Sequence, residues 1–269
     1  MRNSDLSSPL DSLDSLDSLD SSPGAMRHQI AAETLRARSG AALPGLLLTA
    51  LALGALGQLG SVYAETELAA NAVDASHRVV NLAASATLFS SLFGALLITG
   101  EFKSGSIGRS VLYAPGRGAV VGAKLLVAGL VGLVYGLVSV LCSLAVGAAA
   151  FASKDVSLVL DGRTWQLAAA VVGVCALAGP WGAAIGFVVR NQLIAVIGLV
   201  MWGTLGQLMV LGQFPQVGRF LPDGAQLAVL GDRLTLPSAL DAPYGLLLLV
   251  AWGAALALLA HRTFTRRDV

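Results

Sequence analysis

Charge is scarce in this chain of 269 residues. Asp, Glu, Lys and Arg together make up 12% of the sequence, whereas hydrophobic residues make up 55%. A soluble domain usually carries about 25% charged residues. The apolar residues outnumber what one protein core can bury, so we expect lipid to be the second solvent. The formal net charge is only +1, which provides no basic field for binding nucleic acid.

Cysteines are also scarce, and a phosphate-binding loop is missing. The two cysteines, Cys142 and Cys175, lie inside apolar runs, which predicts buried apolar side chains and neither a disulfide framework nor a zinc cluster. No Gly-x-x-x-x-Gly-Lys-[Ser/Thr] phosphate loop is present, because its nearest approach, residues 118–125, has Ala123 and Leu125 at required positions. We therefore expect no catalytic site, cofactor or metal on this chain.

Long uncharged apolar runs are what the sequence does contain. A helix needs roughly 20 apolar residues to cross about 30 Å of hydrocarbon. Six runs of 17 residues or more fit this requirement, and none contains Asp, Glu, Lys, Arg or His: 44–63, 79–99, 125–150, 167–189, 193–211 and 244–260. The sequence predicts an all-α integral membrane protein with six transmembrane helices.

The distribution of basic residues predicts how the chain is oriented. If both termini and the connections after the second and fourth spans are cytoplasmic, 12 of the 17 Lys and Arg residues lie in the cytoplasm. The positive-inside rule favours this orientation. The first 25 residues lack the apolar core of a signal peptide, and we expect them to be a disordered tail built on a repeated Asp-Ser-Leu pattern.

Residues 26–39 are basic and half apolar, which is typical of a helix lying in the headgroup plane. A solvated leader is the alternative. After the second apolar run, Ser106 can cap a short helix on which Ile107 and Val111 share one face, and Pro115 ends it. An exposed apolar edge of this kind fits either a protein partner or the membrane surface.

The connection between the second and third runs carries a family resemblance. It contains Glu101, Phe102, Gly105, Ser106, Leu112, Pro115, Arg117 and Lys124 in that order. The chain after Met26 resembles the permease subunits of bacterial type-two ATP-binding-cassette exporters of the multidrug or antibiotic-export kind. Residues 31–39 and 182–191 match the same family more weakly. The family often has two or three basic residues after the proline, whereas this chain has only Arg117.

The resemblance implies a permease domain over residues 26–269, with an N-terminal interfacial helix and a short cytoplasmic coupling helix that docks on a separate ATPase subunit. Glu101 would lie at the gate end of the second span. The residues implied in coupling are Glu101, Phe102, Ser106, Ile107, Arg109, Val111, Leu112, Pro115 and Arg117. The implied partners are that ATPase, which carries ATP and Mg, and a second permease copy in the bacterial plasma (inner) membrane.

Polar side chains inside the apolar runs are the candidates for lining a translocation path. Tyr135, Ser139 and Ser143 repeat every four residues on one helix face, and Asn81 and Ser85 lie in the second run. They fit a path for a hydrophobic or amphipathic substrate and fit interhelical hydrogen bonding equally well.

Three short features remain. Two Gly-x-x-x-Gly steps, 132–136 and 182–186, indicate tight helix packing. Residues 223–226 can cap a short apolar helix over 227–230, within an outer connection expected to hold short helices.

A secondary transporter is the first alternative function, and it is disfavoured because the runs contain no ionisable group. A membrane anchor or assembly factor is the second alternative, since it needs only the spans.

Overall fold

The fold is that of a computed structural model, which describes residues 30–31, 33–35, 40–107, 117–233 and 235–266. Within these ranges the regular elements are helices, with no strand. The tail 1–25 lies outside the described residues. So does the middle of the predicted coupling segment, with Arg109, Val111, Leu112 and Pro115.

Six helical segments are long and apolar enough to cross a membrane, which confirms the predicted number of spans. They are Ala42–Ala64, Ala72–Ser104, Gly118–Ala152, Gly162–Val189, Gln192–Gln213 and Ala242–Thr265. Each extends past its uncharged run at one end or both. A helix continues through polar residues wherever its backbone hydrogen bonds persist, so the apolar run marks only the part that faces hydrocarbon.

Several spans are built from more than one element. The elements in chain order are α3 (Ala42–Ala64), α4 (Ala72–Leu82), η1 (Ala83–Ser85), α5 (Ala86–Ser104), α7 (Arg117–Ala152), α8 (Gly162–Val189), α9 (Gln192–Met201), the π-helix η2 (Trp202–Gly206), α10 (Gln207–Gln213), α11 (Pro215–Gly218), α12 (Pro222–Leu230) and α13 (Ala242–Arg266). The second span thus comprises α4, η1 and α5, and the fifth comprises α9, η2 and α10.

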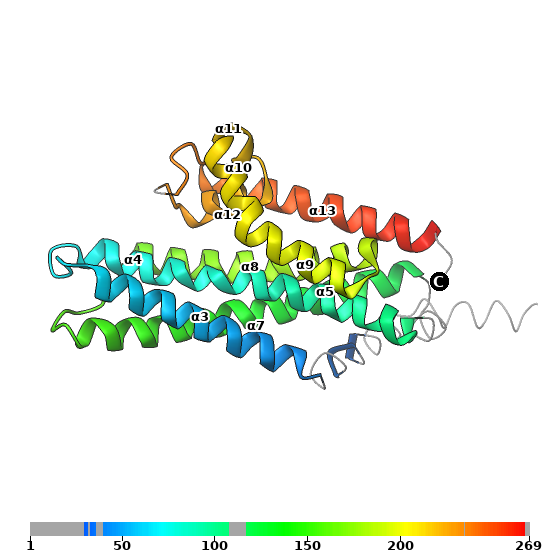
Figure 1. The fold of residues 1–269 in the computed structure, drawn as a ribbon, viewed down its shortest axis with the longest axis horizontal. Helices are drawn as coiled ribbons and strands as arrows, with labels where there is room; N and C mark the ends of the chain where they lie inside the picture. The colour runs from blue at the N-terminus through cyan, green and yellow to red at the C-terminus, as the bar shows by residue number, and fades with distance from the viewer. Residues whose placement is uncertain (1–29, 32, 36–39, 108–116, 234, 267–269) are drawn as a thin grey trace, which may run out of the picture.

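The long helices form a bundle in which α8 packs along both α5 and α7 (Figure 1). The helix α13 lies along α8, and α9 packs on α5. The short helices α11 and α12 gather near α10 at the end of the bundle where α4 begins (Figure 1). The end of α5 and the end of α13 lie at the opposite end of the bundle.

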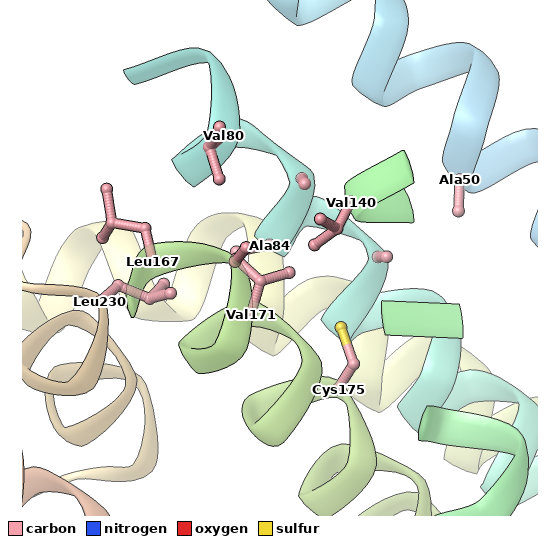
Figure 2. Packing of buried hydrophobic residues seen from close by; sticks show 11 residues of the cluster. Ala50, Val80, Ala84, Val140, Leu167, Val171, Cys175 and Leu230 are labelled. Carbon is pink, nitrogen blue, oxygen red and sulfur yellow. The ribbon is translucent and has the colours of Figure 1, made fainter. Parts of the chain in front are cut away.

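Buried aliphatic side chains from several spans meet in the middle of the molecule (Figure 2). Val80 and Ala84 of the second span contact Val171 and Cys175 of α8 in one buried cluster, which also includes Leu230 of α12. Cys175 is fully buried, as the sequence predicted, whereas Cys142 is only partly buried; both cysteines are free.

Small residues allow α8 to approach its neighbours closely. A methyl group added at Gly182 would lie 1.7 Å from the Ser91 carbonyl oxygen, and one added at Gly94 would lie 2.0 Å from the Gly179 carbonyl oxygen. Ser90 Oγ donates a hydrogen bond of 2.8 Å to the Cys175 carbonyl across the same contact. Glycine is required here because the backbones touch, which confirms the predicted tight packing at residues 182–186.

This packing predicts different outcomes for two substitutions on one helix. Gly182→Ala should lower the thermal stability of the purified protein, because the Ser91 backbone cannot move away from the added methyl group. Gly173→Ala, also on α8, meets no atom within 4 Å and should be neutral or slightly stabilising. Equal melting temperatures in detergent for the two variants would contradict the close contact.

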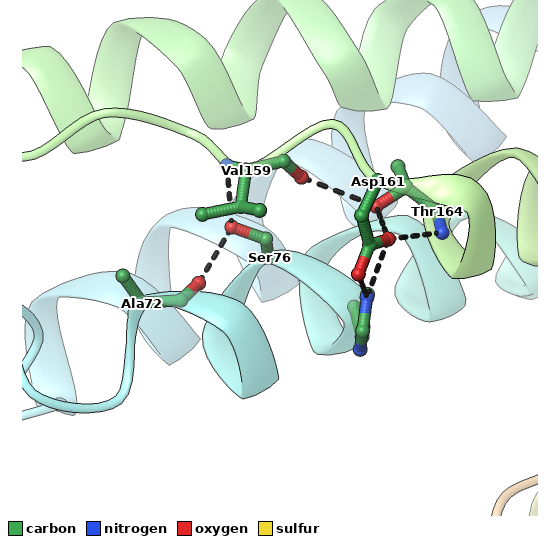
Figure 3. Close-up of polar contacts among 6 residues, drawn as sticks. Ala72, Ser76, Val159, Asp161 and Thr164 are labelled. Carbon is green, nitrogen blue, oxygen red and sulfur yellow. Dashed lines mark hydrogen bonds and ion pairs between the residues drawn. The ribbon is translucent and has the colours of Figure 1, made fainter.

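A polar network at the α4 end of the bundle joins the second span to the start of α8 (Figure 3). Asp161 caps α8 by accepting a hydrogen bond of 2.8 Å from the Thr164 amide. His77 Nε2 lies 3.0 Å from Asp161 Oδ1, and Ser76 Oγ accepts a hydrogen bond from the Val159 amide. The hydrogen bonds from His77 and then from Thr164 hold the pKa of Asp161 well below its ordinary value.

A lowered carboxyl pKa gives a stability that depends on pH. The stabilisation is fully present above the ordinary Asp pKa of about 3.9 and is lost as the pH falls below it. Asp161→Asn preserves the cap but removes the negative charge. Thermal unfolding should show a lower melting temperature for Asp161→Asn at pH 7, and the difference from the native chain should shrink below about pH 4. A difference independent of pH would show that the charge does not stabilise the fold.

The connection between the fifth and sixth spans contains short helices, as expected, but the predicted cap is wrong. The helix α12 begins at Pro222, because proline suits the first helical position, and its N-cap is Leu221 without a side-chain hydrogen bond. Asp223 consequently lies in the first turn of the helix, where its side chain can contact another element.

Candidate functional site

A buried lysine lies between two carboxylates at the end of the bundle where α5 ends. Lys124 is 0% exposed, and its Nζ donates hydrogen bonds of 2.8 Å to Glu33 Oε2 and 2.5 Å to Glu101 Oε1. Both glutamates are also buried. We call these three residues the buried ion cluster. An isolated buried charge is costly, so each member depends on the others for its stability.

Three separate segments supply the buried ion cluster. Glu101 lies in the last turn of α5, which continues to Ser104 and ends at Gly105 in the left-handed conformation with φ of 66°. Lys124 lies in the second turn of α7. Glu33 lies in the leader, of which residues 30–31 and 33–35 are described and helical. The cluster therefore closes the base of the connection between the second and third spans and attaches the leader to it.

The leader also makes an apolar contact with the bundle. Ile30 packs against the buried cluster of Phe93, Val127, Val131 and Tyr135. The described leader residues are helical, as predicted, whereas their position in the headgroup plane stays a prediction.

Sequence reasoning identified Glu101 but missed the buried ion cluster. Two signals could have found it. Glu101 and Lys124 border consecutive spans on the same predicted membrane face, and Glu33 is the one acidic residue of the leader 26–39. The uncharged runs ended before these residues, whereas the helices continue past them. The spans therefore contain Glu101 and Lys124 although the uncharged runs do not, so the uncharged runs alone do not exclude ion-coupled transport.

Ile107 does not present the exposed edge that the sequence predicted. It is 3% exposed and belongs to a buried cluster with Ile98, Val121 and Phe264, from α5, α7 and α13. The reason is the turn at Gly105, after which the chain folds back and brings Ile107 onto the bundle. In this structure Ile107 is a core residue of the chain itself.

The neighbouring predicted coupling residues are also engaged within the chain. The Phe102 ring lies 6.5 Å from the Phe264 ring and 5.1 Å from the Arg190 guanidinium. The Ser106 amide donates a hydrogen bond of 3.1 Å to the Glu101 carbonyl, which completes the end of α5. Arg117 is the first residue of α7.

The burial of Ile107 predicts the effect of truncating it. Ile107→Ala should destabilise the isolated chain by about 2–5 kcal/mol, because the substitution leaves a cavity among α5, α7 and α13. Thermal unfolding of the purified chain without any partner measures this. An unchanged stability, with impaired binding of a partner, would restore the docking role that the sequence predicted.

Three of the predicted path-lining residues are hydrogen-bonded between helices instead. Tyr135 Oη donates a hydrogen bond of 2.9 Å to the Leu43 carbonyl. Ser139 Oγ and Ser143 Oγ donate hydrogen bonds of 2.9 Å and 3.0 Å to the carbonyls of Ala83 and Val79. All three side chains are buried. A hydroxyl on one face of α7 satisfies its hydrogen bond on the facing backbone, so this stripe joins α7 to the first and second spans.

The other two path candidates, Asn81 and Ser85, line a cavity of about 890 Å³. Its walls come from the second span, α8, α9, η2, α12 and α13, and we call it the membrane cavity. It follows α8 from Val174 to Val189, which corresponds to about 22 Å of helix. The lining is mainly apolar with a few polar groups, which is typical of a small-molecule site.

Polar groups in the membrane cavity are incompletely paired. Asn81 Oδ1 and Trp181 Nε1 are buried and have no hydrogen-bond partner among the described residues. The Asp223 carboxylate accepts a hydrogen bond of 2.7 Å from Trp202 Nε1, and burial raises the pKa of this carboxyl. Trp202 begins the π-helix η2, a distortion frequently found at functional sites.

The described part of the chain contains no group of three or more His, Cys, Asp or Glu side chains that could hold a metal ion. What the geometry provides is a mainly apolar cavity along the bundle and a buried ion cluster at one end of it. No protein-family model matches the chain, and no curated protein matches it either.

Proposed function

We propose that this chain is the membrane-spanning permease subunit of an exporter that is driven by a separate ATPase subunit. The observation that carries the proposal is the buried ion cluster, in which Lys124 pairs with Glu33 and Glu101. It unites the leader with the two ends of the connection that resembles a coupling segment. The membrane cavity would then be the path for a hydrophobic or amphipathic substrate.

The buried ion cluster provides a mechanical route for coupling. A push on residues 105–116 acts on α5 and α7 together, because the ion pair between Glu101 and Lys124 fixes the two ends of that connection. The same α5 helix lines the membrane cavity through Thr87 and Ser91. A shift of α5 would therefore change the shape of the cavity.

The proposed assembly follows from this arrangement. The end of the bundle that holds the buried ion cluster would be cytoplasmic, so that an ATPase carrying ATP and Mg can reach it. The fifth span buries only Ala195 of its residues within the chain. Such a helix needs lipid or a second permease copy on its open face. The membrane would be the plasma membrane of a bacterium.

A neutral replacement of Lys124 tests the proposal. Lys124→Met should leave the carboxylates of Glu33 and Glu101 without their shared cation and destabilise the permease by about 3–5 kcal/mol. The permease should be purified together with a candidate ATPase subunit and reconstituted in liposomes. We expect the native chain to stimulate ATP hydrolysis and Lys124→Met to lose the stimulation while still binding the ATPase.

Lys103→Met is the matched control, because Lys103 is exposed on the same turn of α5 as Glu101. It should preserve both stability and stimulation. The coupling proposal fails if no ATPase associates with the native chain, or if Lys124→Met and Lys103→Met stimulate hydrolysis equally.

The buried ion cluster also favours a second candidate, an ion-coupled carrier. Carboxylates within spans are typical of proton pathways. Transport by the permease alone, driven by a pH gradient across liposomes, would support this candidate. Transport that requires both ATP and the ATPase would support the exporter.

A further inference from the structure

We propose that the membrane cavity binds amphipathic cations, with the apolar body of the ligand among tryptophan rings and its positive group beside the Asp223 carboxylate. This inference deepens the proposed function by naming a class of substrate. It rests on that function for transport, but binding itself is a property of this chain alone.

Asp223 is a carboxylate without a cationic partner among the described residues. Several other acidic side chains near this end of the bundle have partners, whereas Asp74 is exposed to solvent. Glu65 pairs with Arg78, Asp241 pairs with Arg233, and both oxygens of Asp232 accept hydrogen bonds from Thr235. The Asp223 carboxylate accepts a hydrogen bond from Trp202 Nε1 in the lining of a largely apolar cavity. A charged group in such surroundings is stabilised by a counter-ion, and the cavity leaves room for one.

Three of the four tryptophans of the chain line the same cavity. They are Trp181, Trp202 and Trp252, from α8, η2 and α13. Hydrogen bonds fix two of the rings: Trp202 Nε1 donates to Asp223, and Trp252 Nε1 donates 3.0 Å to the Phe220 carbonyl. Indole faces attract cations and pack against aromatic ligands. The tryptophans and Asp223 therefore select the same ligand, a cation with a large apolar body.

The remaining polar lining does not favour an anion. Arg78 is the one basic side chain that lines the cavity among the described residues, and Glu65 already neutralises it. Asn81 Oδ1 is a buried acceptor without a donor, which suits the N–H group of an ammonium ligand. The charge of Asp223 and the aromatic lining thus agree on a cation, whereas Trp181 Nε1, a buried donor without an acceptor among the described residues, selects no charge.

Methyltriphenylphosphonium is a suitable probe, because triphenylphosphine oxide is a neutral compound with the same three rings. Binding to the purified full-length permease in detergent should be saturable, with one cation per chain. Asp223→Asn preserves an acceptor for Trp202 but removes the charge. It should raise the dissociation constant for the cation about tenfold or more and leave the weaker binding of the neutral compound unchanged.

Asp74→Asn is the matched control, because Asp74 is exposed on α4 near the same end of the bundle and does not line the cavity. Its binding constants should equal those of the native chain. The proposal is overturned if Asp223→Asn and Asp74→Asn bind the cation equally well. If Asp223→Asn does not fold, the two compounds are compared on the native chain. Equal affinity of the native chain for the phosphonium and the phosphine oxide overturns the proposal.

The test is independent of the ATPase. A permease that stimulates its ATPase but binds no cation would leave the exporter standing and refute this inference. A permease that binds the cation but no ATPase would support this inference and refute the exporter.

Discussion

The pairing of Lys124 with Glu33 and Glu101 is the constraint on which the rest of the structure depends. A fully buried ammonium group is stable only while both carboxylates hold it, and the carboxylates come from the leader and from the end of α5. The second span, the third span and the leader are therefore fixed to one another at a single point. Replacing one member leaves charge without compensation, so each residue of the cluster depends on the other two.

Backbone packing transmits this constraint along the bundle. Close contacts at Gly94 and Gly182 fix α5 against α8 without intervening side chains. Ser139 and Ser143 fix α7 to the second span through its backbone carbonyls. The second span is thus packed tightly against its neighbours, whereas α9, η2 and α10 are little covered by the chain. The membrane cavity lies between these tightly and loosely packed parts, where a change in volume is easiest.

Periodicity and charge predicted the spans because an uncharged run of helical length has few other stable structures. They could not predict the ends of the spans, since Glu101 and Lys124 enter the bundle by pairing with each other across 23 residues. The role of Ile107 depended on the direction of the chain after Gly105, which a helical pattern does not contain. The sequence showed that Ser139 and Ser143 share one helix face. Whether they line a path or form hydrogen bonds between helices depends on the carbonyls that face them, which only the structure shows. The contact between Trp202 and Asp223 depends on a π-helix and on the start of α12, and neither follows from composition.

Hydrogen–deuterium exchange on the assembled complex tests the central claim most directly. The chain would be purified with the ATPase that we propose as its partner, and hydrogen exchange would be compared with and without ATP. Coupling through the buried ion cluster predicts that ATP changes the protection of residues 101–124 and, with them, of the α5 residues that line the membrane cavity. If ATP changes exchange in the ATPase alone and leaves α5 unaltered, energy does not enter the permease by this route.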